Sequence, residues 1–182
     1  MTTYQSQTIY ALLIIATGMF LSSMAYYSMN EIQYIVAIGF FLSAIFAFIT
    51  AFKSKNTEIR MSYHVLHALG MVAYSLAIVF GVNDVQDFFD YTVFFLMYYG
   101  FAEVIFSFQV WMMSQRRINF LLILYRLIVG IFIIIGTIYI LANNDVAEHN
   151  AMLISGAVFI FSGFGVLILT SAVKRADKMR AL

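Results

Sequence analysis

Glu103 is the one charged residue in the fourth apolar stretch of the chain, with no other charge for twelve residues on either side. In a helix that rises about 1.5 Å per residue, it lies roughly 21 Å from the basic end marked by Arg117. If this helix crosses a membrane, that depth is past the middle, where an ionised group is costly even on the mildest insertion scale. Glu103 is therefore expected to be neutral, paired or hydrated.

Arg126 is the one base inside an apolar stretch, nine residues beyond Arg117. On the returning helix it lies about 13 Å deep. A long arginine side chain could close most of the difference in depth, so the first hypothesis is an interhelical ion pair between Glu103 and Arg126. Arg126 could instead extend toward the basic end of its helix, or meet Gln109, which lies at nearly its own depth.

A protonated Glu103 is the second hypothesis, in which this residue carries or senses protons. Tyr99 and Ser107 stand four residues before and after it. A helix places all three on one face, where the hydroxyls could extend a hydrogen-bonded path. The third hypothesis is a solitary, protonated structural glutamate that takes no part in proton movement.

His64 and His67 are three residues apart and could share a metal ion on one helix face. The remaining histidine, His149, belongs to a connection at the other end, and the chain has no cysteine to complete a metal site. Neither a metal nor another cofactor is therefore expected. Both histidines are better explained as hydrogen-bonded side chains near the membrane surface, although His67 could join the polar residues around Glu103. The candidate intramembrane polar cluster comprises Glu103, Arg126, Gln109, Tyr99, Ser107 and His67.

Titratable residues also gather in two connections between apolar stretches, VNDVQDFFD and NNDVAEHN. Crowded like charges raise carboxylate pKa values, so acidification could neutralise these segments and let them pack, which would make them a pH sensor. The plainer interpretation is that the acids are solvated and help to set the orientation of the chain. The candidate sensing residues are Asp84, Asp87, Asp90, Asp145, Glu148 and His149.

Membrane-spanning helices must position these residues. Hydrophobic residues make up 63% of the chain and charged residues 10%, against roughly half and a quarter in soluble domains. With about 20 apolar residues needed for each crossing, 182 residues allow at most six or seven spans. The alternating pattern of barrel strands is not seen, which leaves helices. The predicted spans are Thr8–Met29, Gln33–Phe52, Met61–Val82, Tyr91–Met113, Ile118–Ala142 and Asn150–Val173.

Charge separates the connections into two kinds. Those after the second, fourth and sixth spans carry nine bases and two acids, a net charge of +7, whereas those after the first, third and fifth carry six acids and no base. Segments rich in basic residues stay in the cytoplasm, so both termini are predicted to lie there. The predicted location is the cytoplasmic (inner) membrane. The predicted fold is all-α, with residues 1–182 forming a single six-helix transmembrane domain.

The chain also repeats itself. Odd spans share a glycine, two apolar residues and an asparagine at the outer end, as in GMFLSSMAYYSMN, GMVAYSLAIVFGVN and GIFIIIGTIYILAN. Even spans share an apolar pair, a serine and a basic exit. Three repeated hairpins are therefore predicted, at about residues 8–53, 61–113 and 118–173, followed by a basic cytoplasmic tail at 174–182.

Small side chains recur every seven residues in the even spans. Small residues let helix backbones approach closely, and a strict heptad gives a left-handed crossing. The even helices are therefore predicted to pack against one another at the centre of the bundle or at a subunit interface. The plainer interpretation is that such residues are common in membrane helices. The candidate packing residues are Ala37, Ala44, Ala51, Gly100, Ser107, Gly156 and Gly163.

Six spans in about 180 residues, with these hairpin motifs, resemble the HdeD-like acid-resistance membrane protein family. The resemblance rests on GIFIIIGTIYIL, ISGAVFIFSGFGVLI and GFAEVIFSF, and it extends over nearly the whole chain. Members of that family often have proline at the outer end of the odd helices, where this chain has Asn30, Asn83 and Asn143. The resemblance implies a cytoplasmic-membrane protein linked to survival in acid, without a catalytic mechanism.

No catalytic triad pattern, phosphate-binding loop or metal cluster stands in the sequence, so no enzyme and no catalytic residue is predicted. The favoured function is a role in acid or envelope stress, by pH sensing or by association. The alternative is a proton-coupled small-solute transporter or channel with Glu103 on the pathway. The lack of proline argues for unbroken helices and favours the first. Expected partners are the lipid bilayer and a second copy of the chain or another membrane protein, with no nucleic acid.

Overall fold

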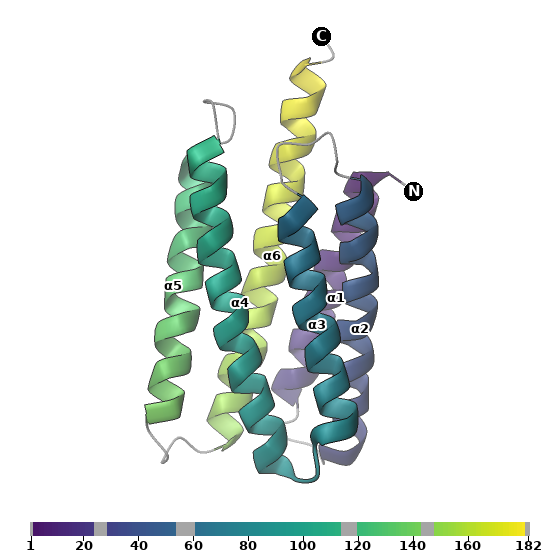
Figure 1. Ribbon diagram of the computed structural model, residues 1–182, viewed down its shortest axis with the longest axis vertical. Coiled ribbons are helices and arrows are strands. Elements are labelled where there is room, and N and C mark those ends of the chain that lie inside the picture. Colours follow the sequence, from purple (N-terminus) through teal and green to yellow (C-terminus); the bar gives the residue numbers. More distant parts are fainter. Residues whose placement is uncertain (1, 24–28, 54–60, 114–119, 143–147, 181–182) are drawn as a thin grey trace.

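The computed structural model describes residues 2–23, 29–53, 61–113, 120–142 and 148–180, and the regular structure within these ranges is helical throughout. Six helices follow one another along the chain as an upright bundle (Figure 1). They are α1 (Thr3–Ser23), α2 (Met29–Lys53), α3 (Met61–Gly81), α4 (Val85–Met113), α5 (Phe120–Ala142) and α6 (Glu148–Arg180). The start of α1 and the end of α6 lie at the same end of the bundle (Figure 1).

Each helix contains a segment of 19 to 25 residues that is long and apolar enough to cross a membrane. Such lengths match a hydrocarbon core of about 30 Å. Large apolar side chains cover the outside of the bundle, among them Phe80, which is 82% exposed, and Phe132, which is 70% exposed. Lipid tails accommodate such a surface, whereas water does not. The chain is a multi-pass membrane protein.

Helix packing divides the bundle into two parts. α1 lies between α2 and α6 and packs along both, while α2 also packs along α3 and α4 packs along α5. The contact between α3 and α4 is smaller, and α6 touches α4 and α5 only lightly. The bundle therefore consists of a group of four helices (α6, α1, α2, α3) and an α4–α5 pair that packs less extensively against this group (Figure 1).

Aromatic rings fill the centre, where the even-numbered helices meet. Phe40 of α2 lies edge-on to Phe159 of α6 and to Phe95 of α4, with ring centroids 4.8 Å and 5.3 Å apart. Tyr74 of α3 packs edge-on against Phe40 and stacks on Phe95. Rings of this size contribute much of the buried contact area. They also keep the backbones of α2, α4 and α6 apart.

The small residues of α4 and α6 bring these helices close to odd-numbered neighbours instead. A Cβ atom on Gly156 would lie 2.5 Å from the carbonyl oxygen of Gly18 in α1. A Cβ atom on Gly130 of α5 would lie 3.1 Å from the carbonyl oxygen of Gly100, and one on Gly163 would lie 2.9 Å from that of Ala11. The predicted small-residue contact among even helices is therefore replaced, within the described residues, by contacts of α6 with α1 and of α4 with α5. On α2 the small residues are buried in the core, at Ala37, Ala44 and Ala51.

Several helix boundaries differ from the prediction. α1 begins at Thr3, five residues before the predicted Thr8, and Met29, the predicted end of the first span, begins α2 in place of the predicted Gln33. α4 begins at Val85, six residues before the predicted Tyr91, because the Asp84 side chain accepts a hydrogen bond from the first turn. α6 continues to Arg180, through most of the predicted tail, since residues 171–180 contain no glycine or proline to end it. Of the three predicted hairpins, α1 and α2 pack along each other, α3 and α4 make a smaller contact, and α5 and α6 touch only lightly. The threefold repeat stays a prediction.

Candidate functional site

Four side chains from three helices meet in a buried polar cluster. Glu103 comes from α4, Arg126 from α5, and Tyr63 and His67 from successive turns of α3. All four are between 1% and 4% exposed. Since charged groups are rarely buried without partners, the contacts among these four residues decide what the site can do.

Glu103 and Arg126 form a two-point ion pair. Arg126 Nε donates to Glu103 Oε2 at 2.7 Å, and Nη2 donates to Oε1 at 2.5 Å. The Tyr63 hydroxyl donates to Oε1 at 3.1 Å and accepts a hydrogen bond from Arg126 Nη2. The guanidinium carbon also lies 5.2 Å from the centre of the Tyr63 ring and 4.8 Å from that of Phe106. The carboxylate and the guanidinium neutralise each other through their paired hydrogen bonds, and the two aromatic rings further stabilise the guanidinium.

His67 extends the cluster toward α1. Its Nε2 atom lies 3.7 Å from Glu103 Oε1, and its Nδ1 atom is within hydrogen-bonding distance, 3.4 Å, of the Tyr10 hydroxyl. The imidazole lies edge-on to the Tyr99 ring, with centroids 4.7 Å apart. One turn away, His64 Nε2 is 3.4 Å from Gln7 Nε2. Polar side chains therefore connect α1, α3, α4 and α5 inside the membrane.

The remaining members of the predicted cluster have other surroundings. The Ser107 hydroxyl donates to the backbone carbonyl of Glu103 at 2.8 Å, so it does not reach the carboxylate. Tyr99 is buried beside His67, but its hydroxyl has no hydrogen-bond partner among the described residues. Gln109 is partly exposed, and no hydrogen bond joins it to Arg126 in the described part of the chain. Of the three hypotheses for Glu103, the structure has the ion pair with Arg126.

Both histidines are buried between helices, at 1% exposure each, and each lies within hydrogen-bonding distance of a side chain of α1. No group of three or more histidine and carboxylate side chains that could hold a metal occurs among the described residues. Glu103 lies ten residues, or roughly 15 Å, before Met113, where both α4 and the predicted span end.

Three polar partners were missed from the sequence: Tyr63, Tyr10 and Gln7. Tyr63 carried a usable signal, because it stands four residues before His67 and shares its helix face. Tyr10 and Gln7 gave none. Their place depends on α1 packing beside α3, which local spacing does not report.

The cavity that Glu103 lines is small. It lies between α5 and α6, and it has a volume of about 10 Å³. One water molecule requires roughly 10–15 Å³. This cavity therefore offers no room for a solute next to the carboxylate.

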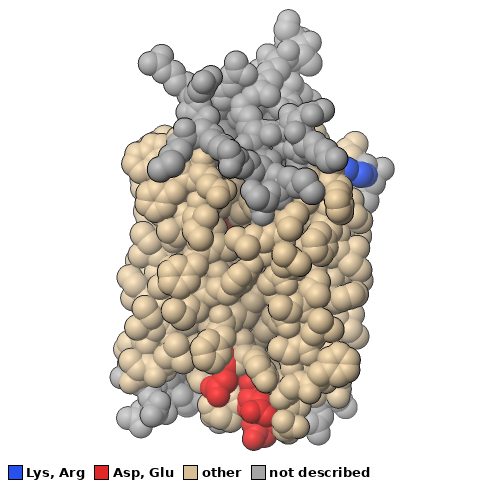
Figure 2. Space-filling model, viewed as in Figure 1, with Lys and Arg blue, Asp and Glu red and all other residues tan. Residues whose placement is uncertain are grey.

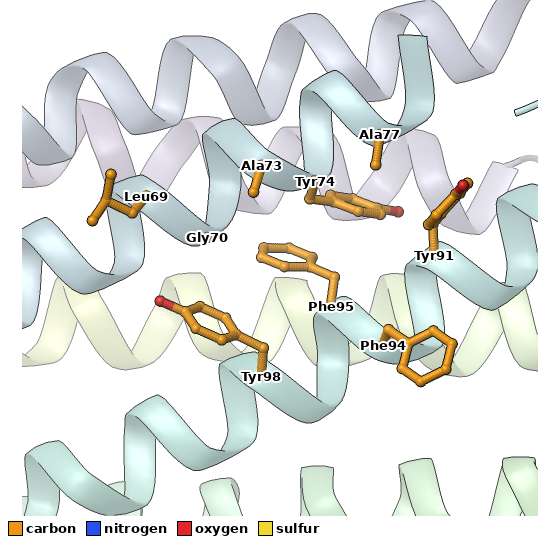
Figure 3. A pocket seen from close by; sticks show the side chains of 9 residues that line it. All are labelled: Leu69, Gly70, Ala73, Tyr74, Ala77, Tyr91, Phe94, Phe95 and Tyr98. Atoms are coloured by element: carbon orange, nitrogen blue, oxygen red, sulfur yellow. The ribbon is translucent and has the colours of Figure 1, made fainter. Parts of the chain in front are cut away.

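A larger, apolar groove of about 410 Å³ lies between α3 and α4, toward the acidic end of the bundle (Figure 3). Gly70, Ala73 and Ala77 form one wall, and aromatic side chains of α4, including Tyr98, form the other. Gly70 lets the Tyr98 ring lie against α3, where its hydroxyl donates to the Leu66 carbonyl oxygen at 2.6 Å. The groove shows that the contact between α3 and α4 is incomplete along its length.

Carboxylates hold the turn that joins α3 to α4 at the end of the bundle away from the termini (Figure 2). Asp84 Oδ1 accepts a hydrogen bond from the Asp87 amide at 2.8 Å. Asp87 Oδ2 accepts from the Asn83 amide at 2.9 Å and from Asn83 Nδ2 at 3.2 Å. Among the described residues, Asp90 Oδ1 accepts a hydrogen bond only from the Gln86 side chain, at 3.0 Å. This arrangement is a reciprocal helix cap built from Asn83, Asp84 and Asp87. It is called the outer cap below because it lies at the end of the bundle that the charge pattern predicts to face outward.

Hydrogen bonds from Asn83 stabilise the ionised form of Asp87, which works against the protonation expected from crowding alone. The other candidate sensing residues lie on the connection before α6. Asp145 is outside the described residues. Glu148 and His149 belong to the first turn of α6, and their side chains are outside the described part.

No family model, curated protein or solved structure matches this chain.

Proposed function

We propose that this chain is a non-enzymatic protein of the cytoplasmic membrane, with both termini inside, that responds to acidification and takes part in acid or envelope stress. It acts through its own packing and through association with a second copy or another membrane protein. The observation that carries the proposal is the outer cap, in which two carboxylates hold the turn between α3 and α4. The contact between these two helices is smaller than those of α2 with α3 and of α4 with α5. The resemblance to the HdeD-like family supports the same role.

The physical link to pH runs through the ionised state of the cap. Asp84 and Asp87 accept backbone hydrogen bonds most strongly as carboxylates. The stabilisation that Asp87 contributes is therefore complete at neutral pH and is lost in strong acid, when this carboxylate binds a proton. Below the cap, α3 and α4 border the groove, and the hydrogen bond between the Tyr74 and Thr92 hydroxyls and the stacking of Tyr74 on Phe95 join them there. Acidification is expected to loosen α4 from α3 on the outer side.

A pair of spin labels measures this response directly. The chain has no cysteine, so labels on Val79→Cys and Phe94→Cys, at exposed positions of α3 and α4, are the sole labelled sites. In lipid bilayers, the distance distribution between the labels should broaden as the pH is lowered from neutral to strongly acidic. Asp87→Asn should remove most of this pH dependence, because the amide side chain does not titrate.

Asp90→Asn is the matched control for that experiment. Asp90 lies one turn further along α4 and bonds a side chain but no backbone amide of the turn. Its replacement should leave the pH response unchanged. Equal loss of the response in both variants, or a wild-type distribution that does not change with pH, would reject the outer cap as the sensor.

Proton flux into liposomes separates this proposal from the transporter alternative. Glu103 is paired with Arg126 and borders a cavity with about the volume of one water molecule. Neither wild-type protein nor Glu103→Gln is therefore expected to conduct protons. The measurement uses purified protein in liposomes that contain a pH-sensitive dye, with a lower pH outside than inside. A flux in wild type that Glu103→Gln abolishes, with unchanged thermal stability, would make the chain a proton pathway and overturn the proposal.

A further inference from the structure

Several buried polar atoms near the ion pair lack a hydrogen-bond partner among the described residues, and two of them, Arg126 Nη1 and Ser162 Oγ, belong to residues that line one cavity. Arg126 is 4% exposed and Ser162 is 5% exposed. Ser155, two turns earlier on α6, shows the usual arrangement, because its hydroxyl donates to the Ala151 carbonyl oxygen at 2.7 Å. An unpaired polar group in lipid is costly, so these two atoms call for a common partner.

Both residues line the same small cavity between α5 and α6. Its volume of about 10 Å³ is close to the roughly 10–15 Å³ that one water molecule occupies. Glu103 forms part of the wall, and Val129 and Phe161 supply apolar surface. The site thus has the size for a single small ligand and two polar groups to hold it.

The charges around the cavity select the ligand. Arg126 is already neutralised by Glu103, so a bound anion would add an uncompensated negative charge, and a cation would face the guanidinium. A water molecule can accept a hydrogen bond from Nη1 and either donate to or accept from Ser162 Oγ. We propose that one water molecule binds in this cavity and bridges Arg126 of α5 to Ser162 of α6.

Such a water supplies a polar link where direct packing is sparse. α5 and α6 touch only lightly, and the α4–α5 pair packs less extensively against the other four helices than those helices pack with one another. A water with well-placed partners is nearly as favourable as a direct hydrogen bond. The bridge therefore ties the α4–α5 pair to α6 at the level of the ion pair, whether or not the outer cap senses pH.

The first test is an experimental structure of the full chain at a resolution that shows ordered water, from crystals grown in lipid with bromide present. Wild type and Ser155→Ala should show a peak at about 2.7–3.2 Å from both Arg126 Nη1 and Ser162 Oγ. Ser162→Ala should lose it. A peak with the anomalous signal of bromide would overturn the proposal, as would a Ser162 hydroxyl that donates to the Val158 carbonyl with no peak beside it.

A second test uses the protein in bilayers by solid-state NMR. Magnetisation transfer from water to the Arg126 guanidinium should be several-fold slower in Ser162→Val, whose extra methyl groups fill the cavity, than in wild type or Ser155→Ala. The Arg126 signal is recognised by its absence in Arg126→Lys. Equal transfer rates in wild type and Ser162→Val would contradict a water held between these residues.

Discussion

Arg126→Met is expected to destabilise the folded bundle by about 3–5 kcal/mol, because it leaves the buried carboxylate of Glu103 without its counter-charge. The Tyr63 hydroxyl still donates to that carboxylate, but one neutral hydrogen bond does not replace a two-point ion pair. The quantity to measure is the free energy of unfolding in mixed detergent micelles, by titration with a denaturing detergent.

The double variant Glu103→Gln with Arg126→Met separates the cost of an unpaired charge from the cost of lost packing. Removing both charges should recover much of the stability lost in Arg126→Met, since a buried pair is often replaceable by neutral groups of similar size. Lys174→Met, at an exposed base near the end of α6, should change little. If the double variant were as unstable as Arg126→Met, the ion pair would not be the source of the effect.

Gly156→Ala is expected to lower the free energy of unfolding by about 1–3 kcal/mol or more, because a Cβ atom there enters the backbone of α1. The added atom would lie 2.5 Å from the Gly18 carbonyl oxygen and 2.6 Å from the Ser22 amide nitrogen. Backbone atoms in a packed helix cannot turn aside as a side chain does, so α1 and α6 must separate. α1 joins α6 to α2, and the loss should spread through the group of four helices.

Gly136→Ala is the matched control, since a Cβ atom on this glycine of α5 meets nothing within 4 Å. Alanine favours the helix by up to about 1 kcal/mol over glycine, so this variant should be neutral or slightly more stable. Both variants are to be compared in the same micelles and in lipid bilayers. Equal stability of Gly156→Ala and Gly136→Ala would mean that α1 and α6 do not approach as closely as the structure has them.

The spans could be predicted closely because they depend on length and composition alone. All six predicted spans correspond to helices. The largest error at the start of a helix is at α4, because hydropathy does not report the cap that Asp84 and Asp87 form there. The polar cluster could be predicted in part. Glu103 and Arg126 stood out as charges in apolar segments, whereas Tyr63 is one of twelve tyrosines and nothing in its type marks it as a partner.

By itself, the amino-acid sequence determined that the chain crosses a membrane as six helices, because transfer of apolar side chains into lipid depends on each segment separately. The tertiary structure alone decided which helices are neighbours. It placed the small residues of α4 and α6 against odd-numbered helices, and it brought Tyr10, Tyr63 and His67 to the ion pair. The physical reason is that lipid and protein interior are equally apolar, so hydropathy does not report which face of a membrane helix turns inward, and packing between distant segments makes that choice.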